Sequence, residues 1–333
     1  MKCLDFDTFL IEDADKMSVD IRSEINKLVN ASEDIEMLNQ VYTILNRKHI
    51  EHLCENISLV NGMVKEHLSV FTDIVERLPG SFEAKEAMLK SYGSTGYVDT
   101  SELLAENKIQ SFSSWMMGGA MSVALFNSLS SHNALRSAGI GPGERAFALL
   151  NPHIKWSGGS EGGGDIQVGK QAIEIKSRVV NAGRLYDPAK SKFQPHAVEE
   201  TLTKVGIDLT NKPSLTAIDY VQNYFPNLTA PQRKAVADSV VKNMFRFTDK
   251  TTELHAALVR GDLEGIRRGY GMSSFYNYLA TSGFSGILML DYPSQTSLYF
   301  TDIANVMDKI RVTSPQIWGS DRDAMPKVHF SAK

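Results

Sequence analysis

The spacing of apolar residues changes near residue 155, from an interval of three or four residues to an interval of two. In the first hundred residues, apolar side chains recur on one helical face, beginning with Ile35, Leu38, Tyr42 and Leu45. Beyond residue 155, the stretches "DIQV" and "QAIEIKS" alternate apolar and polar residues on either side of a Gly169-Lys170 turn. The first spacing predicts amphipathic helices, and the second predicts a β-hairpin. The chain is therefore expected to combine a helical front with an α/β core.

This pattern predicts two domains, a helical N-terminal domain over residues 1–110 and an α/β domain over residues 111–333. We expect the second domain to contain a central mixed β-sheet flanked by helices, with a helical insertion at about residues 187–280. Within the insertion, Thr229 and Pro231 predict an N-cap and a first helical turn. Short apolar runs return over residues 284–318, in "FSGILMLD", "SLYFTD" and "KIRVTSPQIW", and these predict further strands.

The charge of the chain is unevenly distributed. Residues 1–110 contain 20 acidic and 11 basic side chains, whereas the remainder contains 19 acidic and 24 basic side chains. The acidic front suits a contact with a protein partner or with a second copy of the chain. The mildly basic remainder suits an anionic ligand, although a net charge of −4 gives no overall basic signature of nucleic-acid binding.

The two cysteines, Cys3 and Cys54, lie far apart and form no CxxC pair. Their placement argues against a disulfide scaffold and a cysteine-ligated zinc, and it favours a reducing compartment, the cytoplasm. The acidic N-terminus does not resemble a secretory signal. The most apolar stretch, residues 115–129, is shorter than the ~20 residues that cross a bilayer, so we expect a buried helix there and no membrane association.

Three ionisable residues of the predicted hairpin form a candidate chemical site. Glu174 and Lys176 are two residues apart, so on a strand they project from the same face. Asp165 opens the paired strand and is expected to face the same side. Two carboxylates suit Mg²⁺, or Mn²⁺ in its place, because such ions complete their shell with water and substrate phosphate. In the alternative interpretation, the three residues are the solvent-facing side of an ordinary hairpin.

The order of these residues resembles the PD-(D/E)xK, or restriction-endonuclease-like, nuclease superfamily. The resemblance lies in "GPGERAFALL", "GGGDIQV" and "EIKS", and their layout is also similar to that of nuclease-like proteins encoded by tailed phages. It covers about residues 142–180 and, loosely, the later runs, but not residues 1–130. The resemblance implies that Asp165 and Glu174 bind the metal, that Lys176 is the catalytic lysine, and that Glu144 is an acid on the preceding helix. The proline that names the motif is absent, because Gly164 precedes Asp165.

The expected function is therefore that of a Mg²⁺-dependent DNA endonuclease, in the host cytoplasm if a phage encodes it. Lys176 would position or deprotonate the attacking water. The alternative is a nucleic-acid-binding or phage assembly protein that uses the same fold without cleaving. The basic residues after the second strand of the hairpin are candidate phosphate contacts, or alternatively members of a solvated loop: Arg178, Arg184, Lys190 and Lys192. The aromatic residues of the insertion, among them Tyr276 and Tyr278, are expected to be core rather than base-stacking residues.

Overall fold

The computed structural model describes residues 35–135, 140–141, 143–157, 163–178, 185, 192–313, 315–319 and 327–330. The chain divides into two compact units, of which the first ends at Lys90 and the second begins at Ser91. The sequence predicts a helical region up to residue 110. In the structure, the segment from Ser91 onward belongs to the second unit, where strand β1 (Ile109–Ser111) joins the sheet.

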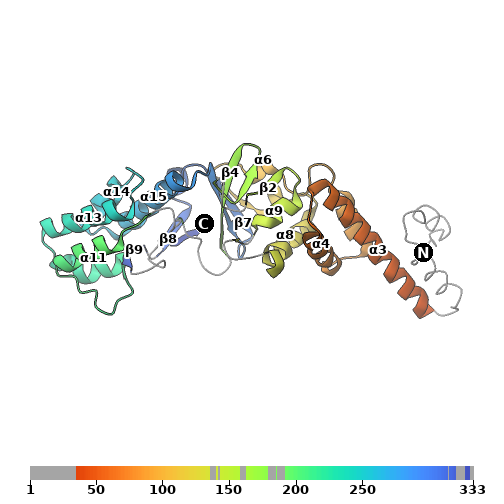
Figure 1. The fold of residues 1–333 in the computed structure, drawn as a ribbon, viewed down its shortest axis with the longest axis horizontal. Helices are drawn as coiled ribbons and strands as arrows, with labels where there is room; N and C mark the ends of the chain where they lie inside the picture. Colours follow the sequence, from red (N-terminus) through yellow and green to blue (C-terminus); the bar gives the residue numbers. More distant parts are fainter. Residues whose placement is uncertain are drawn as a thin grey trace. The chain divides into compact units, whose positions relative to one another are not determined.

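The described part of the first unit is helical, as the apolar spacing predicts. It consists of α3 (Ile35–Asn61), α4 (Lys65–Arg77) and α5 (Phe82–Lys90), with both shorter helices packed against α3. Ile35, Leu38 and Tyr42, on the predicted apolar face of α3, are exposed in the structure. Since α3 has 27 residues and α4 only 13, the first turns of α3 extend past its partner (Figure 1).

The second unit is built on a six-stranded mixed sheet with strand order β1-β7-β6-β4-β3-β2. Strands β4 and β6 at its centre are parallel, and every other pair is antiparallel. The structure therefore confirms the prediction of a mixed sheet and of a hairpin, β3–β4. The remaining strands of this sheet are β2 (Ile154–Trp156), β3 (Ile166–Val168), β4 (Gln171–Arg178), β6 (Gly286–Asp291) and β7 (Thr296–Phe300).

Helices cover both faces of this sheet. On one face, α15 (Leu263–Ser282) packs Phe275 and Tyr278 against Ile287 and Met289 of β6. On the other face lie α7 (Phe112–Trp115), α8 (Gly119–Ser131) and α9 (Glu144–Leu150), whose aromatic side chains contact one another. The single helix expected over residues 115–129 is broken, because Gly118 and Gly119 have positive φ angles. Within the described part of the chain, no helix has the length and apolarity needed to cross a membrane.

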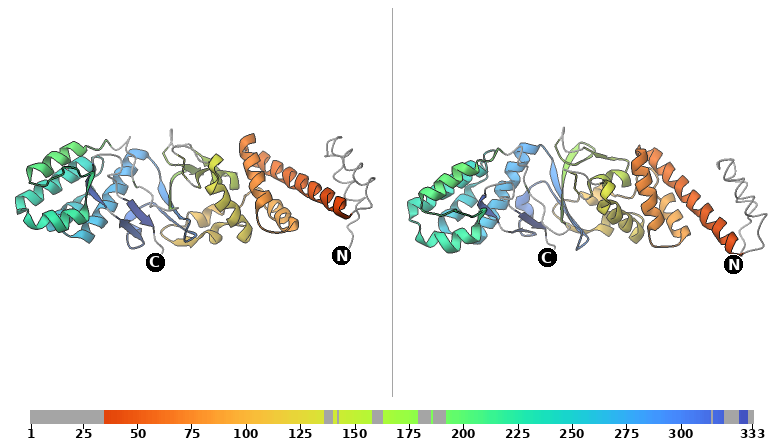
Figure 2. Two further views of the ribbon diagram at one scale, coloured as in Figure 1. Left: turned by 90° about the horizontal axis from the view of Figure 1, so that it is seen from below. Right: turned by 60° about the horizontal axis from the view of Figure 1, so that its bottom comes forward.

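The helical insertion is present and has its own apolar core. It comprises α11 (Pro195–Lys204), α12 (Ala217–Asp219), α13 (Ala230–Met244) and α14 (Thr252–Arg260), and Figure 2 shows these helices gathered as one group. Thr229 forms the predicted cap of α13, within a capping box completed by Gln232.

Not all of the later strands join the main sheet. Strand β8 (Ile310–Thr313) pairs with β10 (Lys327–Phe330), and β9 (Gln316–Gly319) pairs with β5 (Ser214–Thr216). Of the β-like runs over residues 284–318, only the first two therefore extend the six-stranded sheet.

Candidate active site

The β3–β4 hairpin holds Asp165, the residue before β3, against β4. Ile166 pairs with Ile173, and the backbone N–H of Asp165 donates to the carbonyl oxygen of Ile173 at 2.8 Å. Oδ2 of Asp165 accepts a hydrogen bond from the backbone N–H of Ile175 at 2.7 Å. Asp165 is therefore bonded to the two residues that flank Glu174, and the charge of Glu174 contributes to the raised pKa of Asp165.

Lys176 is the third residue of the candidate site, beside Asp165 and Glu174. Its Nζ lies 2.6 Å from Oε1 of Glu174, as expected for residues two apart on one strand. The side chains of Lys176 and Glu174 are only 16% and 9% exposed. The structure therefore does not support the alternative in which these residues form the solvent-facing side of an ordinary hairpin.

Gly164 explains why the residue before Asp165 is not proline. Its φ angle is +84°, and a Cβ at this position would lie 2.8 Å from the backbone nitrogen and oxygen of Ile173. Proline is restricted to a φ angle near about −65°. Close approach of β4 to the start of β3 therefore requires glycine here.

Glu144 lies at the first position of α9, after Gly143, and its side chain is buried. Its Oε1 accepts a hydrogen bond from the backbone N–H of Gly141. Burial, together with the charges of Asp165 and Glu174, raises the pKa of Glu144 to about 7, and Lys176 opposes this shift. The structure thus brings all four predicted site residues into mutual electrostatic range.

The site carries more negative than positive charge. Burial, followed by the charge of Glu174, raises the pKa of Asp165 to about 6. Burial lowers the pKa of Lys176, but the neighbouring Glu174 carboxylate and other groups outweigh it, so the net shift is upward. Lys176 is therefore an ammonium at neutral pH, and the unbalanced carboxylates favour a bound cation.

Tyr278 of α15 belongs to the site, although the sequence predicts a core residue. It is buried as predicted, but its hydroxyl donates a hydrogen bond to Oε1 of Glu174. Nζ of Lys176 donates to the Tyr278 oxygen at 3.1 Å and lies 4.9 Å from the centre of the ring. The sequence carries no signal for this contact, because it depends on how α15 packs across the sheet.

The carboxylates fit Mg²⁺ by their chemistry. Within the described ranges, no group of three or more His, Cys, Asp or Glu side chains is arranged as a metal cage. Mg²⁺ needs fewer protein ligands, since one or two carboxylates together with water and phosphate suffice. Oδ1 of Asp165 and Oε2 of Glu174 make no hydrogen bond to other described residues. Each predicted metal ligand therefore has one oxygen available.

The structure describes two of the four predicted phosphate contacts, Arg178 and Lys192. Arg178 ends β4 and pairs with the buried Asp291 at 2.7 Å, so its guanidinium stabilises the parallel β4–β6 pair. Lys192 is exposed. Arg184 and Lys190 lie outside the described residues.

Two residues beside the site were not predicted from the sequence. The guanidinium of Arg145, next to Glu144, lies 4.6 Å from the centre of the Trp156 ring on the edge strand β2. Trp156 is 37% exposed, and the following residue, Ser157, donates its N–H to the carbonyl of Asp165 at 3.0 Å. Arg145 has no ion-pair partner within the described part of the chain. A tryptophan on an edge strand just before a glycine run is the signal that could have indicated this pair.

Comparisons with protein-family models, with curated proteins and with solved structures give no match. The function therefore has to be inferred from the site itself.

Proposed function

We propose that this chain is a Mg²⁺-dependent nuclease of the PD-(D/E)xK type that hydrolyses phosphodiester bonds in DNA. The observation that supports it most is the group formed on the hairpin by the buried Glu174 with the partly buried Asp165 and Lys176. The mixed sheet, with α9 packed against β2 and β3, is compatible with a restriction-endonuclease-like core. A buried cluster of acids with raised pKa values is typical of functional sites.

In this proposal, Asp165 and Glu174 would hold the metal ion through the carboxylate oxygens that make no hydrogen bond to other described residues. When bound, Mg²⁺ would lower the pKa of a water molecule and polarise a phosphoryl oxygen. Lys176, being protonated, donates a hydrogen bond to the water or to a phosphate oxygen and offsets developing negative charge. The raised pKa of Lys176 favours this role over deprotonation of the water.

Glu144 is the candidate proton acceptor of the group. Its pKa is raised to about 7 by burial and by the neighbouring carboxylates, and a bound Mg²⁺ would lower it again, so that Glu144 would be ionised and able to accept a proton at neutral pH. Its Oε1 is held by the N–H of Gly141, which leaves Oε2 to accept a proton from water. Arg145 and Trp156, beside Glu144, would contact the phosphate backbone and a base of the substrate.

One observation favours a second candidate, a nucleic-acid-binding or assembly protein that does not cleave. Oε1 of Glu174 already accepts hydrogen bonds from Lys176 and Tyr278, as a carboxylate in a purely structural network would. In that case the buried group stabilises the contact between β4 and α15.

Nicking of supercoiled plasmid by the purified full-length chain, in Mg²⁺, Mn²⁺ and EDTA, separates the two candidates. Asp165→Asn is the test variant, because it keeps the side-chain shape and removes the charge. Lys170→Ala is the control, since Lys170 is an exposed lysine in the turn of the same hairpin. We expect metal-dependent nicking by the wild type and by Lys170→Ala but not by Asp165→Asn. Absence of cutting by the wild type on plasmid, single-stranded and branched DNA would overturn the nuclease proposal, as would equal cutting by Asp165→Asn.

A further inference from the structure

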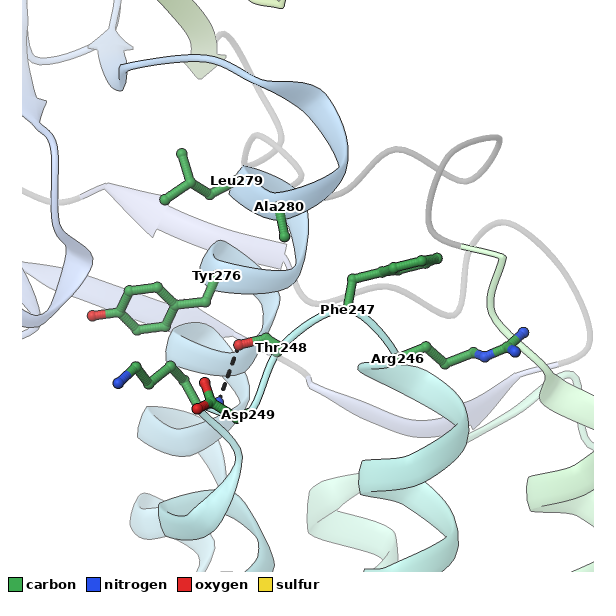
Figure 3. Close-up of a pocket in the computed structure, with 8 residues that line it drawn as sticks. Arg246, Phe247, Thr248, Asp249, Tyr276, Leu279 and Ala280 are labelled. Atoms are coloured by element: carbon green, nitrogen blue, oxygen red, sulfur yellow. Dashed lines mark hydrogen bonds between the residues drawn. The ribbon is translucent and has the colours of Figure 1, made fainter.

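The segment between α13 and α14 forms one wall of an open hollow of about 660 Å³. Arg246, Phe247 and Lys250 line it from this segment, and Tyr276 and Leu279 line it from α15 (Figure 3). Figure 3 shows the ring of Phe247 projecting away from the ribbon of the connecting segment. Phe247 is 42% exposed, so its ring is accessible to a ligand.

Buried side chains of α15 hold this segment in place. The backbone N–H of Phe247 donates to Oδ1 of Asn277 at 2.9 Å. Oγ of Ser273 donates to the carbonyl oxygen of Lys250 at 3.1 Å. Asn277 and Ser273 are both buried, so the backbone is anchored at Phe247 itself and at Lys250, three residues later.

The cations of this hollow lack acidic partners. Within the described ranges, neither Arg246 nor Lys250 forms an ion pair, and Nη1 of Arg246 donates to the carbonyl oxygen of Lys192 at 3.0 Å. Some exposed cations elsewhere on the insertion are paired, as in Lys234–Asp238 at 2.6 Å and Arg268–Glu253 at 3.0 Å. The one acid that lines the hollow is Asp249, so its net charge is positive although the chain carries −4.

We propose that this hollow is a binding subsite for single-stranded nucleic acid. A base would stack on Phe247, and the adjacent phosphates would contact Arg246 and Lys250, the combination by which single strands are bound without sequence preference. The inference rests on the proposed nuclease function and names part of its substrate. Helix α15 links the two regions, since Tyr276 lines the hollow and Tyr278 contacts Glu174.

Equilibrium binding of a fluorescein-labelled oligothymidylate to the full-length chain in EDTA tests this subsite without cleavage. Phe247→Ala is expected to weaken binding about tenfold, since stacking contributes about 1–3 kcal/mol per base. Phe247→Trp should retain the wild-type affinity. The double variant Arg246→Ala/Lys250→Ala should reduce the slope of log K against log salt concentration by the amount expected for the loss of about one to two phosphate contacts. Lys234→Ala, which removes a paired lysine of the same insertion, is the control and should bind as the wild type does.

Three outcomes would overturn the subsite: no binding by the wild type, unchanged binding by Phe247→Ala, or a duplex that binds equally well and is insensitive to Phe247→Ala. The binding assay tests the subsite independently of the nuclease proposal, because the nuclease proposal is tested by plasmid nicking with Asp165→Asn. Binding that depends on Phe247, without any metal-dependent nicking, would keep the subsite and overturn the nuclease. Normal metal-dependent nicking by the wild type, together with wild-type binding of the oligothymidylate by Phe247→Ala, would keep the nuclease and overturn the subsite.

Discussion

Nζ of Lys176 lies 2.6 Å from Oε1 of Glu174, two residues earlier on the same strand. Neither side chain is more than 16% exposed, so the pair lies in a region where water screens charge poorly. In such a place, each charge depends on the other for its stability. The pair is therefore both a structural feature of β4 and the centre of the proposed site.

Removal of the ammonium alone should destabilise the second unit. Lys176→Met keeps much of the aliphatic stem but leaves the Glu174 carboxylate without its countercharge, so we expect the free energy of unfolding to fall by about 3 kcal/mol. Urea denaturation at neutral pH measures the change. The double variant Glu174→Gln/Lys176→Met removes both charges and should recover most of the loss. Equal losses in the single and double variants would show that the two charges are not coupled.

Loss of the Tyr278 hydroxyl should reduce cleavage more than loss of the hydroxyl of another tyrosine on α15. Tyr278→Phe removes a donor to Glu174, and we expect a loss of about 1.5–3 kcal/mol in stability and about tenfold in cleavage rate, because Glu174 is less well oriented. Tyr270→Phe is the matched control, since the hydroxyl of Tyr270, on the same helix, donates to the carbonyl oxygen of Gln316, outside both proposed sites. Cleavage by Tyr270→Phe should match the wild type. A similar fall in cleavage rate in Tyr278→Phe and Tyr270→Phe would argue against a specific role for Tyr278.

Local features of the fold were predictable because neighbouring residues determine them. Alternating residues around Gly169 predicted the hairpin, and Thr229 predicted the start of α13, as the structure confirms. The proximity of Glu174 and Lys176 follows from the same local geometry, since alternate residues of a strand share a face. Asp165 is held by its own hydrogen bonds to Ile173 and Ile175.

Features that depend on distant packing were not predictable. The runs that form β7 and β8 look alike in the sequence, yet β7 joins the main sheet and β8 pairs with β10. Tyr278 contacts a residue 104 positions away, so no local pattern distinguishes it from a core tyrosine. Which strands pair, and which face a helix covers, depends on the whole chain.

The backbone at Gly164 should be intolerant of any side chain. Gly164→Ala would force a Cβ to 2.8 Å from the backbone of Ile173 at a positive φ angle, so β3 and β4 would have to separate at Asp165. We expect a large loss of stability and of cleavage. Gly169→Ala is the control for positive φ alone, because its Cβ would meet nothing within 4 Å at a φ angle of +59°. It should cost about 1 kcal/mol and leave cleavage intact. Comparable effects of the two substitutions on stability and cleavage would contradict the close approach as the cause.

Stabilisation of the protein by Mg²⁺ should increase with pH. The pKa values of Glu144 and Asp165 are raised in the folded chain, to about 7 and about 6 from ordinary values of 4.5 and 3.8. A raised folded pKa stabilises the protein fully below the unfolded value, and this stabilisation is lost as the pH rises through the folded value. In EDTA, these two groups should therefore lower the melting temperature as the pH rises from about 4 to about 7.

A cation that neutralises the carboxylates reverses this loss, so the increase in melting temperature caused by Mg²⁺ should be larger at about pH 8 than at about pH 5. Differential scanning fluorimetry of the full-length chain measures both, with Asp165→Asn as the control in which the Mg²⁺ effect should nearly vanish. An effect of Mg²⁺ that is the same at both pH values, or that persists in Asp165→Asn, would place the bound cation elsewhere in the protein.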